Sequence, residues 1–316
     1  MGLVGKVGKL YRNRGVQQTV VAVIRELYAQ FVLKTLKQRY VNRTIYDRQM
    51  TLDLEDRGIS RALWLFGRRE LDHKWMLEKT LKPRQKMLDI GANIGYYVLL
   101  EHGLVGTSGT IIAVEPSQTN LDLLEKNLKL NGIDNVEVVR GAVSNFSGTG
   151  TFWLARESNL NTFHKAFLDE KSGAVEAIDV EVFSVRDIVD RYGPIDYVRM
   201  DIEGHEVEVL GEIAILAEET QIKPATIFET HTRAYSSDHD IAPVISHLYE
   251  LGYEAKYVSS STEKGSEILE SWGLPAVNRI RTDDVVRTIH QNVPEEVLHS
   301  CFKDTGGIRT VYLEAL

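Results

Sequence analysis

The segment 86–95, KMLDIGANIG, decides the fold class of this chain, and the following residues repeat its pattern. Residues 86–90 are mostly apolar, as expected of a strand that is buried on both faces of a sheet. Gly91 and Gly95 allow the backbone to turn sharply, and residues 95–102 are predicted to form a short helix. A buried strand, a glycine turn and a helix together make the first half of a βαβ unit.

Strand and helix patterns alternate along the rest of the chain. Ser117 is a suitable N-cap for a helix that ends at Asn131. Repeated βαβ units predict an α/β fold with a mostly parallel sheet, helices on both faces, and ligands bound at the carboxyl ends of the strands. Further strands are predicted at 110–114, 136–140, 195–200 and 225–228, with a hairpin at 149–155 and 179–183.

The composition is that of a globular protein with a large buried core, since 43% of the residues are hydrophobic and 26% are charged. Cys301 is the only cysteine, so the chain forms no internal disulfide. No apolar run approaches the roughly 18 residues that a membrane span needs. No secretory signal is recognised either, and these features together predict a cytoplasmic protein.

The net charge of −8 is unevenly distributed along the chain. Residues 1–40 carry a charge of +7, from eight basic side chains and one acidic side chain, and the remainder carries −15. Apolar residues recur at helical spacing between Val16 and Phe31, so residues 1–50 are predicted to be a basic amphipathic helical extension. This helix could contact an anionic membrane surface or an acidic partner, or it could pack on its own acidic domain or mediate self-association. We favour packing on its own domain or self-association over contact with a membrane or an acidic partner.

The loop at residues 89–95 favours S-adenosylmethionine over NAD as the ligand. Its glycines follow the spacing G-x-x-x-G, without the G-x-G-x-x-G arrangement that makes room for a pyrophosphate. The start of the following helix offers unpaired N–H groups to a carboxylate. Asp89 would repel phosphate groups but would suit a cationic amino group or a sulfonium. An NAD-dependent oxidoreductase is therefore disfavoured.

Two further strand ends contribute to the same predicted ligand site. Glu115-Pro116 follows strand 110–114, and a carboxylate at this point can accept hydrogen bonds from both ribose hydroxyls of an adenosine. Ala142 and Val143 follow strand 136–140 and offer small apolar side chains where an adenine ring would lie. An ordinary turn explains Ala142 and Val143 equally well.

Several stretches carry a family resemblance, namely LDIGANIGYY at 88–97, AVEPS at 113–117, RMDIEGHE at 199–206, GRRE at 67–70 and FETH at 228–231. With these motifs the chain resembles the FkbM family of S-adenosylmethionine-dependent methyltransferases. The resemblance implies a Rossmann-like, seven-stranded class I methyltransferase sheet, with S-adenosylmethionine as the methyl donor. It also implies transfer to an oxygen, often a hydroxyl of a sugar or of a polyketide-derived ring. The predicted cofactor-binding residues are Asp89, Gly91, Ala92, Asn93, Gly95, Tyr97, Glu115, Pro116, Ala142, Val143 and Asp201.

Ionisable residues follow two neighbouring strands, where the transferred methyl group should lie. Methyl transfer is an in-line displacement, so the acceptor oxygen must be aligned with the methyl group and the sulfur. A hydroxyl is a poor nucleophile until a carboxylate or an imidazole takes its proton. Glu206 is interpreted as an acid that stabilises a helix dipole. The candidate catalytic residues are Asp201, Glu203, His205, Glu229 and His231, with His205 or Asp201 as the base.

The same strand ends could also hold a divalent metal ion that lowers the pKa of the acceptor hydroxyl. The ligands would then be Asp201, Glu229 and His231. No compact spacing such as H-E-x-x-H supports this alternative, so the sequence favours a site without a metal.

We interpret residues 51–316 as one methyltransferase domain, in which 259–307 matches no motif and is a candidate lid or acceptor-binding insertion. Residues 157–165 carry polar side chains that suit a hydroxylated acceptor. His205 stands where many relatives have a small residue, which leaves the substrate open. The predicted function is O-methylation of a hydroxyl, in a glycan, a glycolipid precursor or a related metabolite. The alternatives are a binding or scaffold protein without catalysis and a nucleic-acid methyltransferase, which the acidic body of the chain disfavours.

Overall fold

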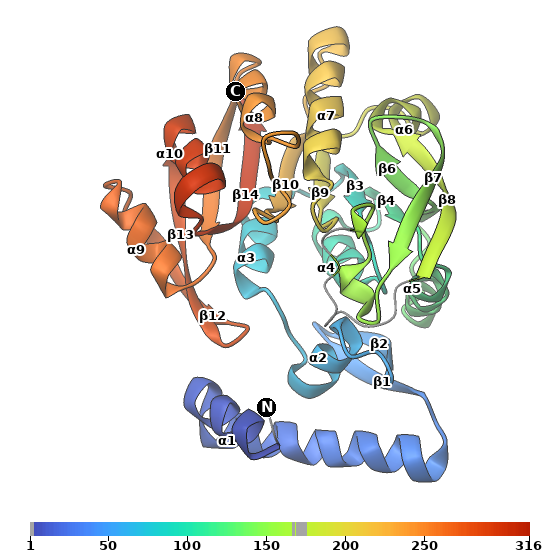
Figure 1. Cartoon of the computed structure of the whole chain (residues 1–316). Helices are drawn as coiled ribbons and strands as arrows, with labels where there is room; N and C mark the ends of the chain where they lie inside the picture. Colours follow the sequence, from blue (N-terminus) through green and yellow to red (C-terminus); the bar gives the residue numbers. More distant parts are fainter. Residues whose placement is uncertain (1–2, 166–167, 169–175) are drawn as a thin grey trace.

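A computed structural model describes residues 3–165, 168 and 176–316, and a nine-stranded sheet lies at its centre (Figure 1). Seven of the strands point the same way, and only β13 and β14 run against them. The predicted α/β fold with a mostly parallel sheet is confirmed. From edge to edge the strands are β12 (Ala276–Thr282), β13 (Val285–Val293), β11 (Tyr253–Ser260), β14 (Ile308–Ala315), β10 (Ala225–Glu229), β9 (Tyr197–Met200), β3 (Lys86–Ile90), β4 (Thr110–Glu115) and β5 (Val136–Arg140).

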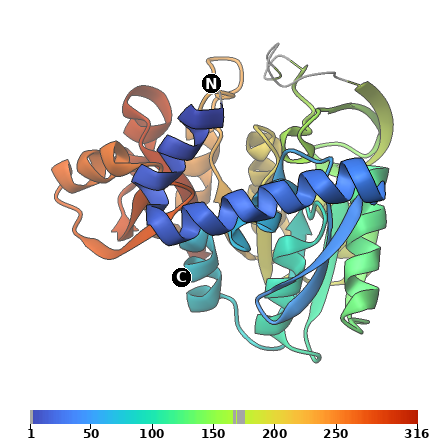
Figure 2. The same cartoon turned by 90° about the horizontal axis from the view of Figure 1, so that it is seen from below.

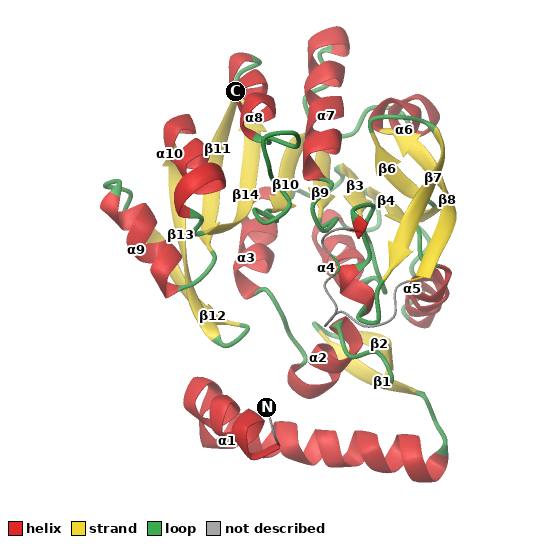
Figure 3. Ribbon diagram, in the orientation of Figure 1, coloured by secondary structure: helices red, strands yellow, loops and turns green. Residues whose placement is uncertain are grey.

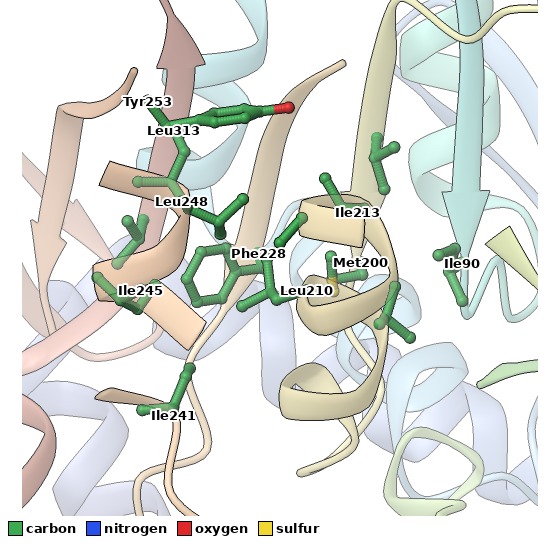
Figure 4. Close-up of a cluster of buried hydrophobic side chains, with 14 of the residues drawn as sticks. Ile90, Met200, Leu210, Ile213, Phe228, Ile241, Ile245, Leu248, Tyr253 and Leu313 are labelled. Atoms are coloured by element: carbon green, nitrogen blue, oxygen red, sulfur yellow. The ribbon is translucent and has the colours of Figure 1, made fainter. Parts of the chain in front are cut away.

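Helices cover both faces of this sheet, because alternate residues of a buried strand point to opposite sides (Figure 3). Ile90 of β3 belongs to the core on one face, whereas Met87 belongs to the core on the other. Figure 4 shows the first core, in which Leu210 lies near Met200 and Phe228. The helices of that face are α6 (Val185–Tyr192), α7 (Glu206–Thr220), α8 (Ala242–Glu250) and α10 (Glu295–Ser300), and those of the other are α3 (Leu71–Thr80), α4 (Tyr96–Val105) and α5 (Gln118–Leu130).

Two strands are added to the seven that the sequence predicts. Residues 259–307 form α9 (Glu263–Ser271), the β12–β13 hairpin, α10 and the short η4 (Cys301–Thr305), and the hairpin extends one edge of the sheet. The turn of this hairpin reaches the start of α3. Thr282 accepts a hydrogen bond from the backbone N–H of Leu71, and Asp283 accepts one from that of Glu70. This segment therefore holds the backbone that carries Glu70.

A smaller sheet lies beside the end of the central one. Its strands, in order across the sheet, are β6 (Ala142–Ser144), β8 (Glu176–Ser184) and β7 (Gly148–Leu154). Along the chain, the short η2 (Ser158–Leu160) follows β7. β7 and β8 pair antiparallel, as the alternating pattern predicts, although they form a separate sheet.

The N-terminal segment is α1 (Leu3–Phe31), which bends at Gly15 and is followed by η1 (Val32–Leu36), β1 (Tyr40–Ile45) and β2 (Arg48–Asp53). Figure 2 shows α1 lying along one side of the molecule. One face of the helix packs on α2 (Ile59–Phe66), where the rings of Tyr28 and Trp64 stack 5.7 Å apart. The side chains of Ile24 and Leu27 on the same helix are exposed. Among the residues that the structure describes, no helix is long and apolar enough to cross a membrane.

Candidate functional site

The carboxyl ends of β3, β4, β9 and β10 open into one cavity of about 900 Å³. This is the place where a largely parallel sheet binds its ligands. The cavity has two ends, which we define by their residues. The glycine-loop end contains Gly91, Asn93, Glu115 and Val143, and the acidic end contains Glu70, Asp201, Glu229 and His231.

Most of the residues predicted from the sequence line this cavity. Asp89 and Gly95 do not belong to its lining, and Gly95 instead faces Leu124 of α5. The lining includes Gly91, Ala92, Asn93, Tyr97, Glu115, Pro116, Ala142, Val143, Asp201, Glu203, His205, Glu229 and His231.

The glycine loop is held against the loop that follows β9. Gly91 has a φ of 80°, and a Cβ on it would lie 2.4 Å from the carbonyl oxygen of Asp201. Only glycine fits such a close approach of two backbones. Asn93 follows with a φ of 50°, and its backbone N–H donates to Glu115 Oε2 over 2.9 Å. The loop therefore joins the ends of β3, β4 and β9 at the cavity wall.

Asp89 lies beneath the cavity, which differs from the direct ligand contact that its sequence position suggests. Its side chain points to the same face of the sheet as Met87, and α4 covers that face. Asp89 is fully buried, and its Oδ1 accepts a hydrogen bond from Arg199 Nη1 over 3.0 Å. Arg199 also pairs with Asp201 over 3.3 Å, so it links Asp89 to the cavity wall. Sequence analysis missed Arg199, although a charged residue inside a buried strand is an available signal.

Glu115 ends β4, and its carboxylate lies at the cavity wall. Its oxygens accept hydrogen bonds from the backbone N–H groups of Asn93 and Ser117 and from the side chain of Asn120. Burial raises the pKa of Glu115 to about 7. A ligand hydroxyl that reached this carboxylate would meet an acceptor whose orientation is already set.

The acidic end brings three carboxylates around one imidazole. His231 Nε2 lies 3.3 Å from Glu203 Oε2 and 3.8 Å from oxygens of both Asp201 and Glu229. Burial raises the pKa of Glu229, and the charge of Asp201 raises it further, whereas Arg309 opposes the shift. Carboxylates with raised pKa values hold protons more tightly, which suits them to proton transfer.

His231 is oriented by Glu206, a role that sequence analysis did not assign. Glu206 is the first residue of α7, and its Oε1 lies 2.8 Å from His231 Nδ1. It also accepts hydrogen bonds from Tyr235 and from the backbone N–H of Gly204. Burial lowers the pKa of His231, but the charges of Glu206 and Glu203 outweigh burial and raise it well above its usual value. The two carboxylates therefore favour the protonated form of the His231 imidazole.

Both ring nitrogens of His205 are turned away from the cavity. Nε2 lies 2.9 Å from Ser144 Oγ, and Nδ1 lies 3.1 Å from His164 Nε2. Burial lowers the pKa of His205 to about 4. These contacts disfavour His205 as the base, and of the two preferred candidates they leave Asp201.

Glu70 and Arg309 complete the acidic end. Arg309 Nη1 lies 2.7 Å from Glu229 Oε1, and its Nη2 donates to Glu70 Oε1 over 3.1 Å. The hydroxyl of Tyr97 donates to the other oxygen of Glu70. Burial raises the pKa of Glu70, but Arg69 and Arg309 outweigh burial and lower it overall. Arg309 was missed because no local motif surrounds it.

Three non-glycine residues of the cavity adopt the left-handed backbone conformation, namely Glu70, Asn93 and Glu203, with φ values between 47° and 50°. Such residues are uncommon and cost free energy, and they cluster at functional sites. Here they occur at both ends of the cavity. The unusual backbone conformations thus occur in the same cavity as the clustered ionisable side chains.

Carboxylate and imidazole atoms at the acidic end are close enough to share an ion in two combinations, Asp201 with Glu203 and His231, and Glu70 with Asp201 and Glu229. The ligand set considered from the sequence is divided between them. Arg309 already neutralises Glu229, and Glu206 already pairs with His231. The acidic end is thus an ion-pair network in its own right.

The comparisons with known proteins identify the family of this chain. A model of the methyltransferase FkbM domain matches residues 89–255, which include both strand-end loops and the glycine loop. The chain belongs to the FkbM family of methyltransferases. The family resemblance that the motifs carry is thereby confirmed.

Individual relatives are more distant. A protein-L-isoaspartate O-methyltransferase of Caenorhabditis elegans is 30% identical over 88 residues, which are 28% of this chain and 38% of that protein. Among solved structures, the methyltransferase FkbM from Methylobacillus flagellatus KT is 16% identical over 72% of this chain and 52% of its own, with a TM-score of 0.34. Aeropyrum pernix fibrillarin with natively bound S-adenosyl-L-methionine is 10% identical over 70% of this chain and 73% of its own, with a TM-score of 0.33.

Proposed function

We propose that this FkbM-family methyltransferase transfers the methyl group of S-adenosylmethionine to a hydroxyl oxygen, in a sugar of a glycan, a glycolipid precursor or a related metabolite. The observation that carries the proposal is one cavity with two unlike ends. The glycine loop and Glu115 line one end, and a buried group of carboxylates lines the other.

The glycine-loop end fits the donor. Gly91 brings the backbone close to the cavity, Glu115 offers a buried carboxylate for ribose hydroxyls, and Ala142 and Val143 leave a small apolar wall for an adenine ring. Several carboxylates lie farther along the same cavity, and their charge favours a cationic sulfonium. The donor supplies an electrophilic methyl group there.

Asp201 is the proposed base. Its side chain lines the cavity, and about a quarter of it is exposed there. As the acceptor oxygen bonds to the methyl carbon and the carbon–sulfur bond breaks, the hydroxyl proton passes to the Asp201 carboxylate. Arg199 and His231 hold this carboxylate from two sides. Glu229 and Glu203 border the same space and would orient the hydroxyl.

The acceptor is expected to be rich in hydroxyl groups. Asn159 and Asn161 line the cavity from the loop after β7, and Glu70 and Arg309 add a charged pair on the other side. Amides and ion pairs of this kind bind hydroxyl groups well. Nucleic acid fits less well, since the carboxylates at this end would repel phosphates.

Calorimetric titration with S-adenosylhomocysteine and with NAD tests the donor assignment. Micromolar binding of S-adenosylhomocysteine by the wild-type protein, weakened by Glu115→Ala and retained by the surface variant Glu125→Ala, is the expected result. Absent binding, or a preference for NAD, would overturn the proposal. Transfer of a labelled methyl group to a panel of hydroxylated glycans then identifies the acceptor.

A further inference from the structure

A second group of ionisable side chains lies at the wall of the cavity, outside the acidic end. It contains three histidines and one glutamate from three segments of the chain. His205 and Glu208 flank the start of α7, His164 follows η2, and His239 precedes α8. The side chains of Glu208 and His239 are each 17% exposed, and His205 is buried.

The atoms of this group are spaced as the ligands of one metal ion are. His164 Nε2 lies 3.1 Å from His205 Nδ1, and His205 Nδ1 lies 3.4 Å from Glu208 Oε2. Ligand atoms of His164, His205 and Glu208 all lie within 4.8 Å of one another. Tetrahedral zinc holds nitrogen and oxygen ligands at about 2.0–2.2 Å, which places them roughly 3.3 Å apart. The separations of 3.1 Å and 3.4 Å from His205 Nδ1 to the other two ligand atoms are close to that edge length.

In His205 and His239, the ring nitrogen that faces away from the group has a hydrogen-bond partner, as the second nitrogen of a metal-binding histidine usually does. Ser144 Oγ lies 2.9 Å from His205 Nε2, and the carbonyl oxygen of Ala234 lies 3.0 Å from His239 Nδ1. A carbonyl can only accept, so His239 Nδ1 carries a hydrogen. His239 Nε2 lies 3.1 Å from both oxygens of Glu208, so an N–H at this nitrogen donates to the carboxylate and holds it in place.

We propose that His164, His205 and Glu208 bind a zinc ion, and that His239 orients the Glu208 carboxylate beside it. Two imidazoles and one carboxylate suit zinc, and the hydrogen bonds of Ser144 to His205 and of His239 to Glu208 hold two of the three ligands in orientation.

The ion would fasten together the segments that form one wall of the cavity. Phe163, next to His164, lines the cavity, as do His205 and Ala234. The rings of Phe163 and His205 lie 4.5 Å apart. Zinc would therefore hold the acceptor side of the cavity in shape without touching the reacting atoms. This role goes beyond the proposed methyl transfer and does not depend on it.

Metal analysis of protein without a polyhistidine tag tests the proposal. After exposure to zinc and removal of the excess, the wild-type protein should keep about one zinc per chain. Protein stripped with a chelator should give the visible absorption of a four-coordinate site when cobalt(II) is added, and zinc should displace that cobalt. Wild-type protein that keeps no zinc and gives no such spectrum overturns the proposal.

Variants assign the ligands. His164→Ala and Glu208→Ala should lose the zinc, whereas His239→Ala should weaken its affinity by about 10–100-fold. His247→Ala is the matched control, because His247 pairs with Glu218 on the surface in the same His–Glu manner, and it should bind zinc like the wild type. Equal zinc retention by all four variants would contradict the assignment. Circular dichroism of each variant shows whether it is folded.

Titration with S-adenosylhomocysteine in the same samples separates the two proposals. If the protein bound S-adenosylhomocysteine but no zinc, only the metal-site proposal would be contradicted. Zinc binding without S-adenosylhomocysteine binding would sink the donor assignment alone.

Discussion

The two ends of the cavity differ in how far apart their residues lie in the sequence. The glycine-loop end uses residues 91–93, 115–116 and 142–143, which follow the consecutive strands β3, β4 and β5. At the acidic end, Arg309 binds Glu70 across 239 positions of sequence. A short loop can present a ligand through its own backbone, so its pattern is local. An ion-pair network at a strand edge exists only after distant segments have met.

The largest expected effect concerns the acidic end. Asp201→Asn keeps the size of the side chain but removes the proton acceptor, so kcat should fall by about 100-fold or more. The Kd for S-adenosylhomocysteine, measured by calorimetry, should change little. Glu125→Gln on the surface serves as the control. A kcat equal to that of the wild type would mean that the base is another residue.

The next effect concerns the buried ion pair of Arg199 and Asp89 beneath the cavity. Arg199→Met leaves the buried Asp89 without its partner, so the free energy of unfolding should drop by about 3–5 kcal/mol. Urea unfolding measures this change. Arg140→Met removes a comparable pair with Glu125, but both of its side chains are half exposed, and the loss should stay below about 1 kcal/mol. Similar losses in the two variants would show that Asp89 is not pinned by Arg199.

A smaller effect is expected at the glycine-loop end. Glu115→Gln keeps one oxygen but removes the charge, so S-adenosylhomocysteine should bind about tenfold more weakly, a cost of about 1.4 kcal/mol. At saturating donor the kcat should remain close to that of the wild type. Asp201→Asn and Glu115→Gln thus separate catalysis from binding. If Glu115→Gln lowered kcat and left the Kd unchanged, the two ends would not be distinct in function.

A further effect depends on pH and concerns Glu101 of α4. Its side chain is buried, and neither carboxylate oxygen has a hydrogen-bond partner among the described residues. Burial raises the pKa of Glu101 well above its usual value, and the charge of Asp89 adds to this shift, while Arg199 opposes it. The folded protein therefore keeps a proton that the unfolded chain releases above about pH 4.3. The contribution of Glu101 to the stability of the wild type should therefore fall as the pH rises, by up to about 1.4 kcal/mol per pH unit.

Glu101→Gln has no such proton to lose. Its stability relative to the wild type should therefore increase between about pH 5 and about pH 8, as measured by urea unfolding at each pH. A difference that stays constant with pH would mean that Glu101 does not retain its proton in the folded state.

Several parts of the fold followed from local patterns. The apolar run of β3, the glycines after it and the spacing to Glu115 are short-range features, and the structure places them as the sequence predicts. The position of the Asp89 side chain did not follow, because alternation along β3 turns it toward α4 while the backbone around it lines the cavity. Likewise β12 and β13 were missed. The half-exposed, alternating residues of the edge strand β12 give a weak signal, and β13 pairs with it only in the folded sheet.

The sequence by itself determined the α/β class, the loop after β3 and the residue types at the strand ends, because these depend on neighbours a few positions apart. Only the tertiary structure decided that Glu206 orients His231, that Arg309 joins Glu70 to Glu229, and that His205 turns away from the cavity toward His164. Each of these contacts joins segments that no short-range pattern connects. Burial then sets their protonation, because the cost of a charge depends on which partners the folded chain brings to it.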